Sequence, residues 1–180
     1  MAGTAAINPG YWGRGRALHV IDLENLIGRI FNQELTRELT RELSRLLIAE
    51  AWTTYERGIG IQNGDRALVV VSNVFARATR AVLPPYVRLQ VCKVEPDAAD
   101  DALKRLAEAE LNRTSFAMVI IASGDHRFAE TADLARSRKL KVWLVSGRGA
   151  VARKLAACCP LRSQLRLSGE GHTESSRQRN

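Results

Sequence analysis

Three clusters of acidic residues have the composition and spacing to carry chemistry. They lie in Asp22-Leu23-Glu24-Asn25, in Asp97-Ala98-Ala99-Asp100-Asp101 and in Ser123-Gly124-Asp125-His126. Carboxylates held close together repel one another, and they stay ionised together only beside a cation. Oxygen ligands with few His or Cys favour Mg²⁺ or Mn²⁺, and such an ion can activate water and stabilise charge on a phosphodiester oxygen. The clusters predict a divalent-cation site formed by Asp22, Asp100 and Asp125, provided that the fold brings them together.

Five short apolar runs, separated by helical patterns, would position these clusters. Runs 67–71 and 117–121 are continuous and rich in branched residues, as in strands covered on both faces, whereas run 87–92 alternates as an edge strand does. The other two are 17–21 and 142–145. Strands joined by helices favour right-handed crossovers and a parallel sheet. We expect a single doubly wound, Rossmann-like α/β domain over 15–167, with a mostly parallel five-stranded sheet in the order 3-2-1-4-5. A flexible segment 1–14 and a disordered tail 168–180 would flank it.

The predicted strand order places the acidic clusters at one point. In doubly wound sheets, sites form outside the carboxyl ends of the strands where the order reverses, here between the first and fourth strands. Asp22 and Asp125 follow those two strands, and Asp100 and Asp101 open the helix before the fourth strand. Each acid also has an ordinary structural interpretation as a helix cap or first-turn residue. Their common position at the reversal point favours a shared site.

Motifs for several other chemistries are absent from the sequence. It has no P-loop and no Gly-x-Ser-x-Gly elbow, and Gly13-Arg14-Gly15 precedes the first strand, so it is no dinucleotide fingerprint. A phosphatase with Asp22 as nucleophile would place a second Asp where Glu24 stands, which makes that alternative weak.

Together the three clusters resemble the motifs of the NYN domains, a branch of the PIN-like ribonucleases. Ile21-Asp22-Leu23-Glu24-Asn25 is similar to their first motif, Ala99-Asp100-Asp101-Ala102-Leu103 to their helical acidic motif, and Ser123-Gly124-Asp125-His126-Arg127-Phe128 to their Ser-Gly-Asp-x-Asp-Phe signature. The resemblance covers about residues 17–146 in the same order. It implies a PIN-like fold and a metal-dependent endoribonuclease. The resemblance further implies that Asp22, Asp100 and Asp125 of this chain would hold Mg²⁺ or Mn²⁺. Asn25 would support the site, and Asp101 would share the role of Asp100.

The third motif departs from the family pattern at Arg127, which stands where the family has a second Asp. The change removes one negative charge and adds a positive one, which would weaken metal binding or supply a phosphate-binding cation. Glu130 or Asp133 could provide the missing oxygen. His126 would be a proton shuttle or an ordinary surface histidine. The alternative function is therefore a catalytically weak or inactive RNA-binding or adaptor module on the same fold.

The net positive charge of the chain comes from its last quarter. The net charge of the 180 residues is +8; residues 136–180 hold eleven Lys and Arg against two acids, whereas residues 1–135 hold 16 against 17. A basic segment beside a near-neutral body favours a polyanionic partner, nucleic acid first. We expect single-stranded RNA, contacted by Arg127, Arg148, Arg153 and Lys154. A basic surface that only aids solubility is the plainer alternative.

The remaining expectations concern compartment and assembly. The three cysteines lack metal or disulfide spacing, and no apolar run is long enough to span a bilayer, so we expect a cytoplasmic protein with no membrane partner. A helix over 34–57 carries a leucine stripe. The stripe would cover the sheet or, alternatively, form a homodimer contact. It consists of Leu35, Leu39, Leu43 and Leu46/Leu47.

Overall fold

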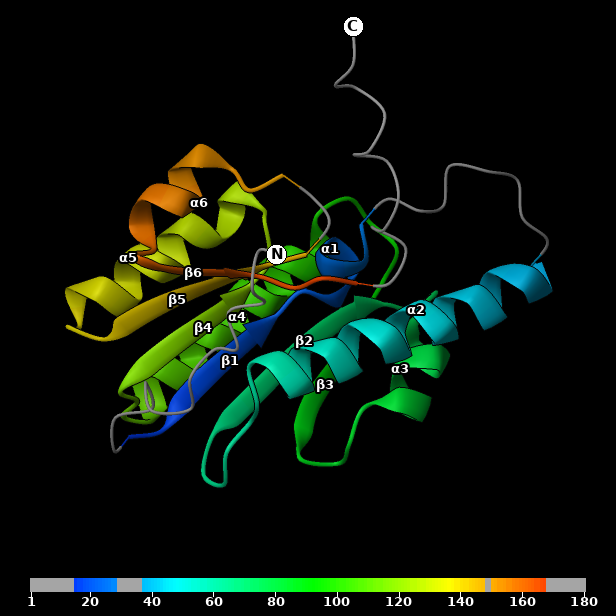
Figure 1. Cartoon of the computed structure of the whole chain (residues 1–180), viewed down its shortest axis with the longest axis horizontal. Helices are drawn as coiled ribbons and strands as arrows, with labels where there is room; N and C mark the ends of the chain where they lie inside the picture. Colours follow the sequence, from blue (N-terminus) through cyan, green and yellow to red (C-terminus); the bar gives the residue numbers. More distant parts are fainter. Residues whose placement is uncertain (1–14, 29–36, 148–149, 168–180) are drawn as a thin grey trace, which may run out of the picture.

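The computed structural model describes residues 15–28, 37–147 and 150–167, with backbone only over 37–41, and forms a parallel sheet between two layers of helices (Figure 1). The strands are β1 (Ala17–Ile21), β2 (Arg66–Ser72), β3 (Val87–Cys92), β4 (Met118–Ala122), β5 (Lys141–Ser146) and β6 (Leu161–Gln164). The α-helices are α1 (Leu23–Ile27), α2 (Arg37–Gly58), α3 (Ala76–Val82), α4 (Ala98–Arg113), α5 (Ala129–Ser137) and α6 (Arg153–Cys158). A 3₁₀ turn, η2 (His126–Phe128), precedes α5.

The order of the strands is β3-β2-β1-β4-β5-β6, and every pairing between them in the described residues is parallel. The predicted α/β class and the order of the first five strands are confirmed, with β3 at an edge. The predicted count of five strands is wrong. β6 is only four residues long and alternates half-buried with exposed positions, so it lacks an apolar run. It is held by its backbone pairing with β5 and by Trp143, whose Nε1–H donates to the Ser163 hydroxyl at 3.0 Å.

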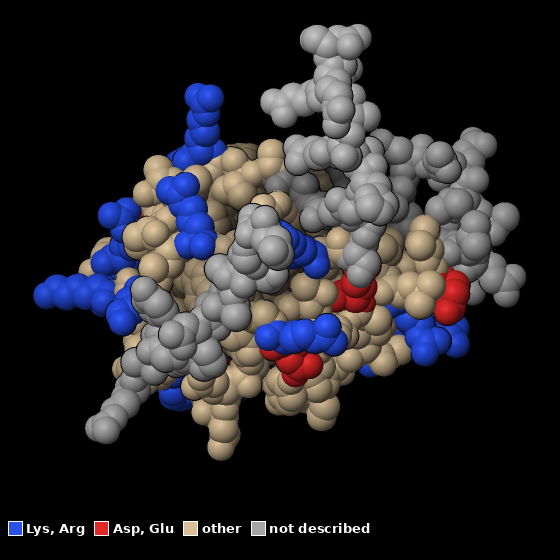
Figure 2. Space-filling model, viewed as in Figure 1, with Lys and Arg blue, Asp and Glu red and all other residues tan. Residues whose placement is uncertain are grey.

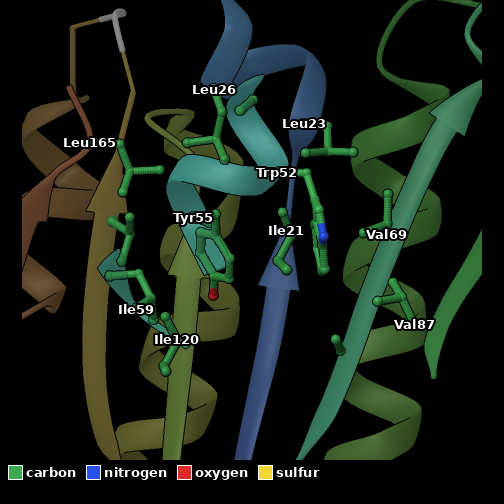
Figure 3. Close-up of a cluster of buried hydrophobic side chains, with 14 of the residues drawn as sticks. Ile21, Leu23, Leu26, Trp52, Tyr55, Ile59, Val69, Val87, Ile120 and Leu165 are labelled. Atoms are coloured by element: carbon green, nitrogen blue, oxygen red, sulfur yellow. The ribbon is translucent and has the colours of Figure 1, made fainter. Parts of the chain in front are cut away.

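The two faces of the sheet bury different helices because successive side chains of a strand point to opposite faces. Figure 3 shows the face covered by α1 and α2, where Trp52 and Tyr55 pack against Ile21 and Ile120. The neighbouring residues of the same strands, such as Val20 and Ile121, point to the opposite face and pack against α4, α5 and α6. The central strands are therefore buried on both faces, as their continuous apolar runs predict.

Helix α2 covers the sheet, as expected, but not through all the predicted leucines. Its buried residues are Ser44, Ile48, Ala51, Trp52 and Tyr55. Leu43 and Leu47 are half-buried, whereas Leu46 is 59% exposed because it points away from that face, so its predicted place in the stripe is wrong. Residues 34–36 and the side chain of Leu39 lie outside the described residues, as do the segments 1–14 and 168–180.

A buried polar group anchors the amino end of β1, opposite the predicted site. His19 Nδ1 lies 2.8 Å from the Tyr55 hydroxyl and Nε2 lies 3.2 Å from Asp65 Oδ2. Burial alone would raise the pKa of Asp65, but hydrogen bonds from His19 and from the backbone of Ala17 and Gln62 lower it. This group ties β1 to α2 and to the turn before β2. None of the described helices has the length and apolar character that crossing a bilayer requires.

Candidate active site at the carboxyl ends of the strands

Asp22 occupies the first position after β1, at the point where the strand order reverses. Its N–H donates to the Ala122 carbonyl at 3.0 Å, which extends the β1–β4 pairing by one residue and places Asp22 beside Ser123. One carboxylate oxygen accepts the Asn25 N–H at 3.0 Å and so caps α1, and the other accepts the Ser123 hydroxyl at 2.8 Å. Asp22 is 6% exposed. The parallel register therefore fixes the orientation of this carboxylate.

The turn after β4 is joined to the same group by hydrogen bonds. Gly124 N–H donates to Asn25 Oδ1 at 2.7 Å, and Asp125 N–H donates to Ser123 Oγ at 3.1 Å. A Cβ at Gly124 would lie 2.8 Å from the Ala150 carbonyl oxygen, so only glycine lets the β5–α6 connection approach this closely. Asp125 in turn accepts the Arg127 N–H at 2.8 Å and caps η2. Asn25 therefore positions the β4 turn, as a supporting residue would.

A cavity of about 840 Å³ opens at this end of the sheet and collects the predicted acids. Asp22, Asn25, Asp100 and Asp125 all line it, and Asp100 reaches it from the first turn of α4. The remaining acids and apolar residues of its wall include Glu24, Ile27, Val74, Phe75, Cys92, Val94, Glu95, Asp97 and Ala99. The fold thus brings together acids that lie more than 100 positions apart in the sequence.

Negative charge predominates in the cavity. Burial, together with the nearby Asp100 carboxylate, raises the pKa of Asp22 from 3.8 to about 7. Burial and the Asp125 carboxylate raise the pKa of Asp100 to about 6, and the Arg127 guanidinium opposes that increase only in part. These side chains interact as charges across the cavity, and a cation between them would lower both pKa values.

Asp101 and Arg127 lie beside the cavity rather than in its wall. The Arg127 guanidinium pairs with Asp97 at 2.5 Å and with Asp101 at 3.4 Å, joining the β4 turn to the start of α4. Asp101 faces a second hollow that Arg105 also lines. Asp97 stands at the N-cap of α4 with a φ of 61° and makes no capping side-chain hydrogen bond. Asp101 therefore does not share the position of Asp100.

The two acids proposed as substitutes for the missing carboxylate are engaged elsewhere. Glu130 is 66% exposed and pairs with Lys104 at 2.7 Å, and Asp133 pairs with Arg136. Neither lines the cavity. The exposed ring of His126 lies 3.1 Å from Asp125 Oδ1 through its Nδ1 atom.

Glu24, Glu95 and Asp97 are cavity acids that the sequence reasoning did not place in the site, and Glu24 lies nearest to Asp22 in the sequence. It accepts the Ser72 N–H at 2.8 Å, which ties α1 to the end of β2 and aims the carboxylate into the cavity. Its position in the sequence, two residues after Asp22 and just beyond an apolar strand, could have indicated that it belongs to the site. Ser123, fully buried between Asp22 and the Asp125 backbone, was also missed. A hydroxyl that follows a buried strand and precedes Gly-Asp was the corresponding signal.

Basic side chains flank this acidic region. Ala152 N–H donates to the Gly124 carbonyl at 2.9 Å, so α6 begins beside the Asp125 turn and presents Arg153 and Lys154, both exposed. Figure 2 shows Lys and Arg side chains gathered over the end of the molecule that holds β5, α5 and α6. Of the exposed cations of these elements, Arg153 and Lys154 lie at the start of α6, whereas Arg136 and Lys141 lie toward the opposite edge of the sheet, where α5 ends and β5 begins. Arg148 lies outside the described residues.

The donor set of the cavity fits a hard divalent cation in its chemistry. Its oxygens come from carboxylates and the Asn25 amide, and two of the carboxyl groups have raised pKa values because burial and neighbouring carboxylates disfavour their charge. Among the described residues, no three His, Cys, Asp or Glu side chains already stand in a ready-made ligand group.

Comparisons with known proteins identify no family. No protein-family model matches the sequence, and no curated protein matches it. Among solved structures, the chain is similar to a Vibrio parahaemolyticus protein of unknown function at 14% sequence identity and a TM-score of 0.49. That similarity covers 83% of this chain and 93% of the other.

Proposed function

We propose that the protein is a metal-dependent endoribonuclease of the NYN type, on a PIN-like fold, that hydrolyses phosphodiester bonds of single-stranded RNA. The observation that carries the proposal is the meeting of Asp22, Asp100 and Asp125 at one cavity, at the reversal point of the sheet. These are the positions at which the sequence resembles the NYN motifs. RNA is a polyanion, and its phosphates would bind both to a cation held by the acidic residues and to the basic side chains of α6.

Asp22, Asp100 and Asp125 would hold Mg²⁺ or Mn²⁺, with Glu24 available from the same wall. When bound, the ion supplies an activated water and charge stabilisation at the phosphate. Asn25 and Ser123 orient the carboxylate-bearing turns through hydrogen bonds of 2.7 to 3.1 Å. Arg153 and Lys154, at the start of α6 beside the Asp125 turn, would bind the RNA backbone.

The test is cleavage of a labelled single-stranded RNA in Mn²⁺ and in EDTA. We expect cleavage only with the metal, and Asp125→Asn should lower the rate about 100-fold or more because one anionic ligand is lost. Asparagine keeps an oxygen that can accept the Arg127 N–H, so the turn should stay folded. The matched control is Asp133→Asn, an exposed acid outside the cavity, which should cleave as fast as the unmodified protein. Equal rates for Asp125→Asn and the unmodified protein would refute the proposal.

The alternative is a weakly active or inactive RNA-binding module, and the observation that favours it is Arg127. Its guanidinium occupies two of the nearby acids, Asp97 and Asp101, and offsets part of the charge on Asp100. Calorimetric titration with Mn²⁺ separates the two functions. No heat of binding, with an RNA affinity that EDTA leaves unchanged, would support the module and contradict the nuclease.

A further inference from the structure

The cavity changes its chemistry along the edge of the sheet. Asp22, Glu24 and Asp125 follow β1 and β4, and Asp100 opens α4. The segments after β2 and β3 contribute the apolar side chains Val74, Phe75 and Val94, and the second of them also contributes the acids Glu95 and Asp97 before α4 begins. Val74 is 59% exposed and Val94 is 63% exposed. They are two of the four large hydrophobic side chains that stand exposed among the described residues, and both lie in this one wall. We call Val74, Phe75 and Val94 the apolar wall.

The apolar wall lies at the ends of the strands next to the acidic centre. Neighbouring strands are about 4.8 Å apart, so the ends of β2 and β3 stand about 5 and 10 Å from the end of β1. Phe75 is half-buried against the hydrophobic core, which holds the wall in place. The cavity volume of about 840 Å³ lies in the range of sites that take a small organic group.

One cation accompanies the wall. Lys93, exposed between Cys92 and Val94, is the one Lys or Arg among the described residues that line the cavity. A surface that pairs apolar side chains with a cation suits single-stranded nucleic acid, since each nucleotide offers a flat base and a phosphate. A base held in a duplex cannot reach such a wall, because its faces are stacked on its neighbours.

We propose that Val74, Phe75 and Val94 form a nucleobase subsite, in which an unpaired base of the RNA packs while Lys93 contacts the adjoining phosphate. This inference rests on the proposed function and deepens it. Such a subsite would select unpaired RNA beside the carboxylates, because it contacts the base as well as the charged backbone.

The test measures binding, so that it stands apart from cleavage. Fluorescence anisotropy compares a labelled single-stranded RNA with an oligomer of equal length and charge that carries abasic sugars, using Asp125→Asn protein in Mn²⁺ so that the RNA stays intact. We expect the intact RNA to bind about five- to tenfold more tightly. In the same background, Val74→Ser with Val94→Ser should reduce that ratio to about twofold or less. Leu46→Ser, equally exposed but on α2 and outside the cavity, should leave the ratio unchanged.

Two further variants separate contact with the base from contact with the phosphate. Val94→Thr preserves shape and fold, and should lower the ratio in part. Lys93→Gln should weaken both oligomers by the same factor and lower the salt dependence by about one counterion. A parent protein that binds both oligomers equally, or a serine double variant that keeps the full ratio, would overturn the subsite. If the unmodified protein shows no metal-dependent cleavage, the proposed nuclease function is overturned instead, so the two failures are distinguishable.

Discussion

Replacing Asp22 with asparagine should stabilise the metal-free protein at high pH. The carboxylate is 6% exposed, and its pKa rises from 3.8 to about 7 because burial and Asp100 disfavour its charge. At about 1.4 kcal/mol per pKa unit, ionising this group in the folded state costs about 4 kcal/mol at a pH above 7. The amide of asparagine carries no charge and removes this cost.

Part of that gain is offset by the altered hydrogen bonds. Asparagine can still accept the Asn25 N–H through its oxygen, but its NH₂ group would face Ser123 Oγ, so the Ser123 O–H would lose the carboxylate oxygen to which it now donates at 2.8 Å. Such a mismatch costs about 1 to 2 kcal/mol. The variant should therefore be more stable than the unmodified protein by about 2 kcal/mol near pH 8.

The sign of the stability difference between the two proteins depends on pH. The unfolded chain ionises Asp22 near 3.8 and the folded chain near 7, so between these values the folded state holds more protons and its stability falls as pH rises. The full contribution is present below about pH 4 and is lost above about pH 7. The variant lacks this fall, so it should be the less stable protein near pH 4 and the more stable one near pH 8.

Urea unfolding in EDTA across this range measures the difference between the two proteins directly. Asp133→Asn, an exposed control, should differ from the unmodified protein by less than about 0.5 kcal/mol at every pH. Saturating Mn²⁺ should then restore stability to the unmodified protein and much less to Asp22→Asn, since a ligand stabilises only the state that binds it. A difference between Asp22→Asn and the unmodified protein that does not change with pH would refute the reasoning.

Two further predictions concern the supports of the site. Gly147→Ala would place a Cβ 2.3 Å from the Leu26 carbonyl oxygen, so α1 must move; unfolding should become easier by about 2 kcal/mol or more and cleavage should fall. Gly58→Ala is its control, because a Cβ there meets only Leu165 at 3.6 Å, and calorimetry should show little change. Arg127→Ala should retain metal-dependent cleavage and lose less than about 1 kcal/mol of stability, since its ion pairs are partly exposed and its side chain stands outside the cavity wall. Complete loss of cleavage in Arg127→Ala would assign this residue a direct role.

Local pattern accounts for most of the fold. The runs at β1, β2, β4 and β5 are apolar because both faces of these strands are buried, and the alternation at β3 reflects its edge position. β6 escaped this reasoning because a short edge strand with polar residues depends on its partner for its hydrogen bonds. Leu46 was misplaced because it follows Leu43 by three residues, and at 3.6 residues per turn this step rotates it away from the buried face, whereas Leu47, four residues after Leu43, is rotated toward that face.

The sequence by itself determined the class of the fold, the order of its first five strands and the meeting of Asp22, Asp100 and Asp125 at one edge of the sheet. Parallel topology makes that meeting follow from the position of each acid along the chain. Only the tertiary structure decided which neighbouring acids join them. The direction of a side chain at a helix start or turn depends on the contacts it finds in space. Glu24 turns inward because the Ser72 N–H lies within reach, whereas Asp101 turns toward the Arg127 guanidinium, 26 positions along the chain.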